Sequence, residues 1–289
     1  MTKVAARPSS ISRMLIGYSI EVNPSDSKAV DAALDRLDRG TEVFLTWIPG
    51  ADPMHMVSPA AKLRRASLLP VPHVGARHLE GTAQLEQFAS RMAGAGVDRI
   101  LVIGGDRAKP AGPYDSSLAV MQTEVFQRRG IVRMAVAGFP EDSPNIPAVA
   151  LDEALDAKVN FAQTSGLQLS IVSQFCFKAE PIVAWMQRLR ARGIQNPVHV
   201  GLAGPARLPT LARYAVHCGI GNSLHVLTQH PSFAKLLTDK GPEPIIRDIA
   251  LSAGSRENGM LQLGIASLHF YVFGGFNRTL DWINSERAE

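Results

Sequence analysis

The sequence predicts an α/β fold, a (β/α)8 TIM barrel with extra helices between the seventh and eighth strands. Eight short apolar, β-branched runs alternate with helix-like stretches along the 289 residues. The runs are apolar on both faces, as in a parallel sheet that is covered on both sides. No G-x-G-x-x-G motif follows the first run, which disfavours a doubly wound dinucleotide-binding sheet. We therefore expect residues 1–289 to form a single barrel domain.

The eight expected strands follow one another at spacings that leave room for a helical connection after each. Parallel neighbours in one sheet need right-handed crossovers, and a helix is the usual one. In chain order, the expected strands are 15–22, 41–48, 68–74, 99–105, 131–139, 167–175, 197–204 and 266–274.

Three of the connecting stretches show clear helical periodicity. In 79–95, apolar residues fall at positions i, i+3, i+4 and i+7, and in 151–162 they repeat every four residues. The stretch 180–192 has Pro181 in its first turn, and Gly193 follows as a stop signal. These patterns are typical of the outer helices of a barrel.

The connection between the seventh and eighth expected strands is the longest one. Residues 205–265 are too many for one helix, and we expect two additional helices there, at 222–237 and 243–258. No internal repeat, low-complexity segment or interdomain linker is visible in the sequence.

Composition excludes several functional classes. Hydrophobic residues make up 46% and charged residues 19%, with a net charge of +4 and no short block of basic residues, so nucleic acid is not an expected partner. No apolar run approaches the ~20 residues of a membrane span, and the N-terminus lacks a signal-peptide core, so neither a membrane nor export is expected. Cys176 and Cys218 form no C-x-x-C pair and no H-E-x-x-H occurs, so we expect no metal and a cytoplasmic location.

The carboxyl ends of the expected strands carry polar, aromatic and glycine residues. In a (β/α)8 barrel these ends build the active site. Each residue alone has a plain structural explanation, but buried polar groups that gather at one rim need partners or a ligand. The residues are Glu21, Thr46, His73, Gly104-Gly105-Asp106, Phe139-Pro140-Glu141, Gln174, Gly201 to Pro205, and His269-Phe270-Tyr271.

Two acids at this rim each have two interpretations. Asp106 follows two glycines, which allow close approach of a flat ligand, and its carboxylate could accept a hydrogen bond from a heterocyclic N–H. It could equally be the N-cap of the next segment. Glu21 could pair with a rim cation, or it could be a half-buried acid whose pKa is raised by apolar neighbours such as Tyr18.

The rim residues, taken in order, resemble the methylenetetrahydrofolate reductase family of flavin-dependent (β/α)8 barrels. The resemblance covers roughly residues 15–278. The pieces that carry it are Ile20-Glu21, Leu45-Thr46, Pro72-His73, Gly105-Asp106, Pro113-Tyr114-Asp115-Ser116-Ser117-Leu118, Phe139-Pro140-Glu141, Lys158-Val159, Ser173-Gln174-Phe175-Cys176-Phe177, His269-Phe270-Tyr271 and Asn277-Arg278.

The resemblance implies a flavoenzyme of one-carbon metabolism. Its reaction interconverts 5,10-methylenetetrahydrofolate and 5-methyltetrahydrofolate in a ping-pong cycle through FAD, with NADH or NADPH as reductant. Glu21 is implied as the general acid that helps to open the folate ring, and Asp106 as a catalytic residue beside the flavin and the pterin. Gln174 and Tyr271 are implied as folate contacts. The implied cofactor-binding residues are Thr46, His73, Gly105, Asp106, Tyr114, Ser116, Phe139 and Lys158.

The chain also departs from the family pattern. Gly104 stands where the family often has an arginine, and Phe139 replaces a tyrosine. The loop after the seventh strand offers Leu208 in place of an aromatic residue. Two alternatives therefore stay open: a folate- or pteridine-binding barrel without flavin, of the methyltransferase type, and a barrel that binds folate or flavin without turnover. The direction of the reaction and the oligomeric state also stay open.

Overall fold

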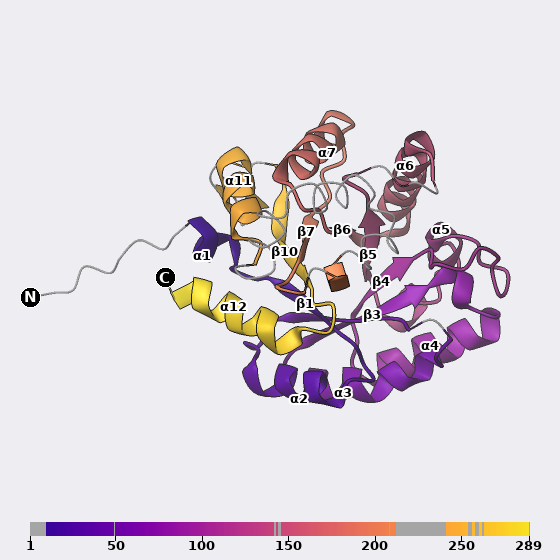
Figure 1. The fold of residues 1–289 in the computed structure, drawn as a ribbon. Helices are drawn as coiled ribbons and strands as arrows, with labels where there is room; N and C mark the ends of the chain where they lie inside the picture. The colour runs from indigo at the N-terminus through magenta and orange to yellow at the C-terminus, as the bar shows by residue number, and fades with distance from the viewer. Residues whose placement is uncertain are drawn as a thin grey trace, which may run out of the picture.

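Eight parallel strands close into a barrel surrounded by helices, which confirms the predicted fold class (Figure 1). The computed structural model describes residues 10–48, 50–141, 143, 146–207, 209–211, 241–253, 256–257, 260–261 and 263–288. Around the barrel the strands follow the order β1-β10-β7-β6-β5-β4-β3-β2. Their bounds are β1 (Ser19–Val22), β2 (Glu42–Leu45), β3 (Leu69–Gly75), β4 (Arg99–Ile103), β5 (Arg133–Gly138), β6 (Gln168–Ser173), β7 (Val198–Ala203) and β10 (Ile265–Tyr271).

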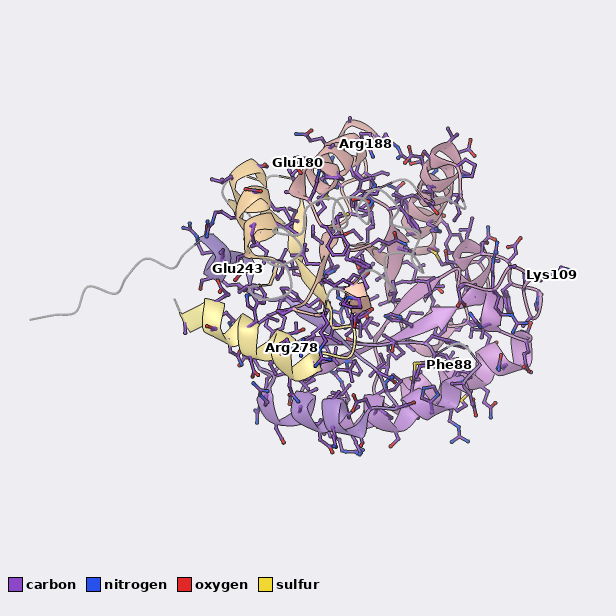
Figure 2. The ribbon with its side chains drawn as sticks, viewed as in Figure 1. Phe88, Lys109, Glu180, Arg188, Glu243 and Arg278 are labelled. Carbon is purple, nitrogen blue, oxygen red and sulfur yellow. The ribbon has the colours of Figure 1, made fainter. Side chains whose placement is uncertain are left out.

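The helices form the outer ring of the barrel, and they include the three connecting helices that the sequence predicts. Charged side chains such as Glu180 and Arg188 extend outward from this ring, whereas Phe88 is fully buried (Figure 2). The helices are α1 (Ser10–Met14), α2 (Ser27–Arg36), α3 (Val57–Arg65), α4 (Thr82–Gly94), α5 (Ser117–Met121), α6 (Ala148–Ser165), α7 (Ala179–Ala191), α11 (Glu243–Ala253) and α12 (Phe276–Ala288). None of the helices in the described part of the chain is long and apolar enough to cross a membrane.

The first strand begins later than the sequence predicts. The apolar run was expected to be extended from Leu15, but the strand starts at Ser19. Helix α1 ends at Met14, and Gly17 has a φ of +70°, a backbone conformation that turns the chain before the strand. Leu15 is fully buried, so its apolar character reflects packing of this turn and not strand pairing.

The long connection before β10 also differs in part from the prediction. Helix α11 ends at Ala253, earlier than the expected helix end at residue 258. It is followed by a two-stranded antiparallel pair, β8 (Arg256–Glu257) and β9 (Met260–Leu261). Asn258-Gly259 separates these strands in the sequence, a dipeptide typical of hairpin turns. The helix expected at 222–237 lies outside the described residues.

The interior of the barrel holds a separate apolar cluster and several polar side chains. The cluster consists of buried side chains from β2 to β6: Phe44, Val71, Leu101, Ala135 and Val172, with Ile103 packed against them. The polar side chains include Ser19, Glu21, His73, His199, Ser267 and His269. Burying a polar group costs free energy unless the group is hydrogen-bonded. The polar side chains near the carboxyl ends of the strands therefore mark these ends as a candidate site.

Helix α2 begins at a side-chain cap that gives a testable contribution to stability. The carboxylate of Asp26 accepts a hydrogen bond from the Ala29 N–H at 3.1 Å. We expect Asp26→Ala to lower the free energy of unfolding by about 1 kcal/mol, the usual effect of losing an N-cap. Asp31→Ala, at an exposed position of the same helix, is the matched control and should change it by less than about 0.5 kcal/mol. Urea unfolding of both variants measures the difference, and equal losses would contradict the capping role.

Candidate active site at the carboxyl ends of the strands

Glu21 lies between two imidazoles at the mouth of the barrel. Its Oε1 is 3.7 Å from Nε2 of His73 and 3.7 Å from Nε2 of His269, and its side chain is 13% exposed. Burial raises the pKa of Glu21 to about 7, against a smaller opposing effect of His73. Near neutral pH this carboxyl group therefore exists both as acid and as base, which suits a residue that gives a proton to a substrate.

The two histidines beside Glu21 are neutral. Burial lowers the pKa of His73 to about 4 and that of His269 to about 3. The Nε2 atoms of both rings are buried and have no hydrogen-bond partner among the described residues. Since 3.7 Å exceeds a hydrogen-bond length, the two rings face the Glu21 carboxyl group without holding it. Glu21 is therefore free to change its protonation state and to turn toward a ligand.

The ring of His269 is fixed by its surroundings. Its Nδ1 is hydrogen-bonded to the Ser19 hydroxyl at 2.9 Å, and the side chain is fully buried. The rings of Phe44 and Tyr271 pack against it, with centroids 4.4 Å and 4.8 Å away. Ser19 and Glu21 are two residues apart on β1, so both side chains point into the barrel. The sequence analysis missed the Ser19–His269 pair, which the alternation on β1 could have suggested.

Asp106 belongs to a second cluster at the rim, after β4. Its Oδ1 lies 2.6 Å from Nε2 of His78, and its side chain is 43% exposed. The preceding Gly105 has a φ of +90°, and an added Cβ would lie 2.8 Å from the His78 ring, so both conformation and space require glycine. The N-cap interpretation of Asp106 is wrong, because the next helix, α5, is capped by Ser116.

The loop that carries Asp106 is held by an arginine that the sequence analysis did not single out. Arg77 Nε donates to the Asp115 carbonyl at 2.7 Å, and its Nη1 donates to the Arg107 carbonyl at 3.1 Å. Its backbone N–H donates to the carbonyl of Gly104 at 2.9 Å. The guanidinium group that holds this loop therefore comes from the segment after β3.

Three residues expected to bind a cofactor have well-defined surroundings. The Tyr114 ring is buried and its hydroxyl is hydrogen-bonded to that of Thr82 at 3.0 Å. The Ser116 hydroxyl accepts from the Ala119 N–H at 3.3 Å as the cap of α5. Lys158 on α6 is partly buried, and burial lowers the pKa of its amine. The hydroxyls of Tyr114 and Ser116 are thus engaged within the protein.

The opposite side of the mouth is aromatic. The Tyr271 hydroxyl donates to the Ser173 carbonyl at 3.0 Å, and the Tyr271 ring lies 5.5 Å from Phe175 and 6.2 Å from Phe273. The backbone N–H of Gln174 donates to the Gly138 carbonyl at 2.9 Å, which places this residue at the carboxyl end of β6. Phe175 is buried beneath these rings, and Phe273 is a partly buried aromatic residue near the mouth, which the aromatic-rich run from His269 to Phe276 could have indicated.

The remaining expected residues also lie at strand ends. Thr46 follows β2 and its backbone N–H donates to the Val22 carbonyl at 3.2 Å. Phe139 directly follows β5, and both residues are partly buried. The barrel therefore brings Glu21, Thr46, His73, Phe139, Gln174 and Tyr271 to the same end, together with the Gly105–Asp106 loop.

A comparison with protein-family models identifies the relatives of this barrel. Residues 11–274 match the model described as methylenetetrahydrofolate reductase. The match runs from α1 past the end of β10 and includes all eight barrel strands. The chain belongs to the methylenetetrahydrofolate reductase family. This match confirms the resemblance found in the sequence. Members of the methylenetetrahydrofolate reductase family are folate-related enzymes and are generally associated with flavin.

The titrating groups at the mouth predict a pH dependence of stability. Below about pH 6.5 the unfolded chain protonates His73 and His269, whereas the folded chain, with pKa values of about 4 and 3, does not, so the free energy of unfolding falls. Glu21 opposes this between its folded pKa of about 7 and its unfolded value of 4.5, because there the folded chain holds the extra proton. Below 4.5 the opposing contribution stops growing.

We therefore expect a shallow loss of stability from pH 6.5 to 4.5, a steeper loss from pH 4.5 to about 4, and a smaller slope again below pH 4, where His73 and then His269 also take up protons in the folded chain. Urea unfolding at several pH values measures it, and Glu21→Gln should make the loss above pH 4.5 steeper by removing the opposing group. An identical pH profile for the variant would contradict the assignment of these three groups.

Proposed function

We propose that this chain is an FAD-dependent oxidoreductase that interconverts 5,10-methylenetetrahydrofolate and 5-methyltetrahydrofolate, with NADH or NADPH as the reductant. The observation that carries the proposal is the buried Glu21, with a pKa of about 7 between two neutral imidazoles, at the mouth of a barrel of this family. An acid of this kind is what ring opening of the folate requires, because a departing amine must be protonated at neutral pH.

The residues at the rim fit a flat, anionic cofactor. Gly105, with its φ of +90° and the His78 ring packed against it, fixes the turn that presents Asp106 at the rim. Asp106 beside it accepts hydrogen bonds, and the cation of Lys158 suits a pyrophosphate. Thr46, His73 and Phe139 complete the proposed set. Tyr114 and Ser116 use their hydroxyls within the protein, so the proposal gives them the role of shaping the loop.

The bound flavin would supply the hydride chemistry, and the chain would supply the proton and the positioning. Glu21 gives its proton to the amine nitrogen that leaves as the five-membered ring of the folate opens. The carboxylate of Asp106 stabilises the positive charge that remains on the substrate. Gln174 hydrogen-bonds the folate, while Tyr271, held by Ser173, lines the pocket.

Anaerobic stopped-flow spectroscopy tests the proposal directly. The protein is incubated with FAD, mixed with NADH or NADPH, and then mixed with the folate. We expect flavin absorbance that bleaches with one of the two nicotinamides and returns with 5,10-methylenetetrahydrofolate. Protein that gains no flavin absorbance but still binds the folate would support the flavin-free alternative of the methyltransferase type. Flavin that neither nicotinamide can reduce would support the non-catalytic alternative.

A further inference from the structure

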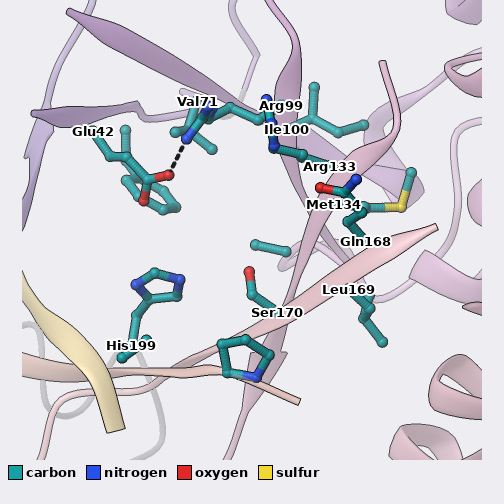
Figure 3. A pocket seen from close by; sticks show the side chains of 14 residues that line it. Glu42, Val71, Arg99, Ile100, Arg133, Met134, Gln168, Leu169, Ser170 and His199 are labelled. Atoms are coloured by element: carbon teal, nitrogen blue, oxygen red, sulfur yellow. Dashed lines mark hydrogen bonds and ion pairs between the residues drawn. The ribbon is translucent and has the colours of Figure 1, made fainter. Parts of the chain in front are cut away.

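A cavity of about 350 Å³ opens at the end of the barrel opposite Glu21 (Figure 3). It lies among the first residues of β2, β4, β5 and β6, the end of a barrel that normally serves stability. Its volume falls within the range of about 300–1,000 Å³ that small-molecule sites occupy. Its walls are largely apolar and include Phe44, Val71, Met134, Ala135 and Leu169.

Three polar groups converge on this cavity. In Figure 3 the carboxylate of Glu42, the ring of His199 and the hydroxyl of Ser170 point into the same space. Glu42 uses one oxygen, Oε1, in its contact with Arg99, which leaves the other oxygen. His199 uses Nδ1 in a 2.8 Å hydrogen bond with the Ser267 hydroxyl, which leaves Nε2. The Ser170 hydroxyl makes no hydrogen bond to any residue in the described ranges.

All three groups can accept a hydrogen bond. Burial lowers the pKa of His199, with smaller influences from Glu42, Arg99 and His269, so the ring is neutral. When Nδ1–H donates to Ser267, the lone pair of Nε2 faces the cavity. A carboxylate oxygen, an imidazole nitrogen and a hydroxyl oxygen then form a set of three acceptors.

The charges around the cavity disfavour an anion. Arg99 and Arg133 also line the cavity, but Arg99 is ion-paired with Glu42 and Asp98, and Arg133 is ion-paired with Asp98, so neither guanidinium group is left unpaired to hold an anion. A metal ion is also disfavoured, because the described residues contain no group of three or more His, Cys, Asp and Glu side chains placed to hold one. The cavity itself contributes only Glu42 and His199 of these types.

We propose that this cavity binds a small primary alkylammonium ion. An ammonium group has three N–H donors, one each for Glu42, Nε2 of His199 and the hydroxyl of Ser170. The alkyl group packs against Phe44, Val71 and Met134. This site is separate from the mouth of the barrel and does not depend on the proposed redox reaction, so its test is binding to the protein without flavin or folate.

The experiment uses propylammonium chloride as the probe and follows the melting temperature and the ¹⁵N resonances of His199. Propylammonium well above its dissociation constant should raise the melting temperature by about 2 °C or more and should shift the Nε2 resonance of His199. Propan-1-ol has the same alkyl group without the charge, and tetramethylammonium has the charge without N–H donors. Neither should produce these shifts at matched ionic strength.

Variants assign the contacts. Glu42→Gln and Ser170→Ala should each weaken propylammonium binding about tenfold or more, whereas Glu86→Gln, at an arginine-paired glutamate on α4, should bind as the wild type does. If Glu42→Gln does not fold, the propylammonium affinity of Ser170→Ala alone tests the proposed contacts. The absence of any shift with wild-type protein would overturn the proposal, and so would equal shifts with tetramethylammonium or undiminished binding by Ser170→Ala.

Discussion

Replacing Glu21 by glutamine should separate the two half-reactions of the proposed enzyme. Glutamine has the size of glutamate and matches the uncharged, protonated form of Glu21, but it cannot act as a general acid. We expect reduction of bound flavin by NAD(P)H to stay within about twofold of the wild type, while the reaction with 5,10-methylenetetrahydrofolate slows by on the order of 10²-fold or more, the usual effect of losing a general acid. Anaerobic stopped-flow measurement of each half-reaction gives both rates.

The design of this comparison distinguishes chemistry from structure. Glu153→Gln, at an exposed position of α6, is a matched control that should leave both rates unchanged. Loss of both half-reactions to the same extent would show that Glu21 holds the mouth together instead of giving a proton. We expect the flavin half-reaction to be spared because Glu21 has no hydrogen bond or charged partner in the two neutral imidazoles beside it, so its replacement by glutamine removes little structure.

Replacing Gly201 by alanine should have the largest effect on folding. An added Cβ would lie 2.2 Å from the Ser173 carbonyl oxygen and 2.7 Å from the Tyr271 ring, and a backbone atom cannot move aside as a flexible side chain can. We expect a loss near the upper end of the about 1–3 kcal/mol that overpacking costs, measured by urea unfolding. The Tyr271 ring should also be displaced, which weakens folate binding.

A second glycine provides the control for this substitution. Gly94, at the end of α4, has no atom within 4 Å of the position of an added Cβ. Gly94→Ala should therefore leave stability unchanged or raise it by up to about 1 kcal/mol, because alanine favours the helix. Similar losses of stability at both positions would contradict the assignment of the Gly201 effect to lack of space.

The fold could be predicted because its main signal is local. Alternating apolar runs and helical periodicity identified all eight barrel strands, and the order of strands around a barrel follows from their order in the chain. The predictions failed where apolar character did not mean strand. Leu15 is apolar because it packs beneath a turn, and the 243–258 helix gave way to a hairpin after Ala253.

The candidate site could be predicted only in part. Position at a strand end indicated Glu21 and Asp106, since that depends on the chain order alone. The partner of each side chain could not be found in this way. Alternation on β1 places Ser19 inside the barrel, but its hydrogen bond with His269 depends on the register of β1 with β10, 250 positions later in the chain. The His78–Asp106 contact likewise joins segments that follow two different strands. The hydrogen bond of the Tyr114 hydroxyl to Thr82, at the start of α4, likewise could not be predicted, because residue spacing does not show that the two lie side by side.

The contact between Ser173 and Gly201 also has a kinetic consequence. β6 and β7 share two register pairs, as β1 and β10 do, whereas β5 and β6 share six. Toward the mouth, the join between β6 and β7 is completed by the Ser173 hydroxyl, which accepts from the Gly201 N–H at 2.8 Å, and by the Tyr271 hydroxyl on the Ser173 carbonyl. Side chains exchange partners faster than a strand ladder does, so transient opening of the barrel wall should begin at this seam. Opening at this seam would part the wall of the barrel directly beside Gln174, the residue proposed to contact the folate.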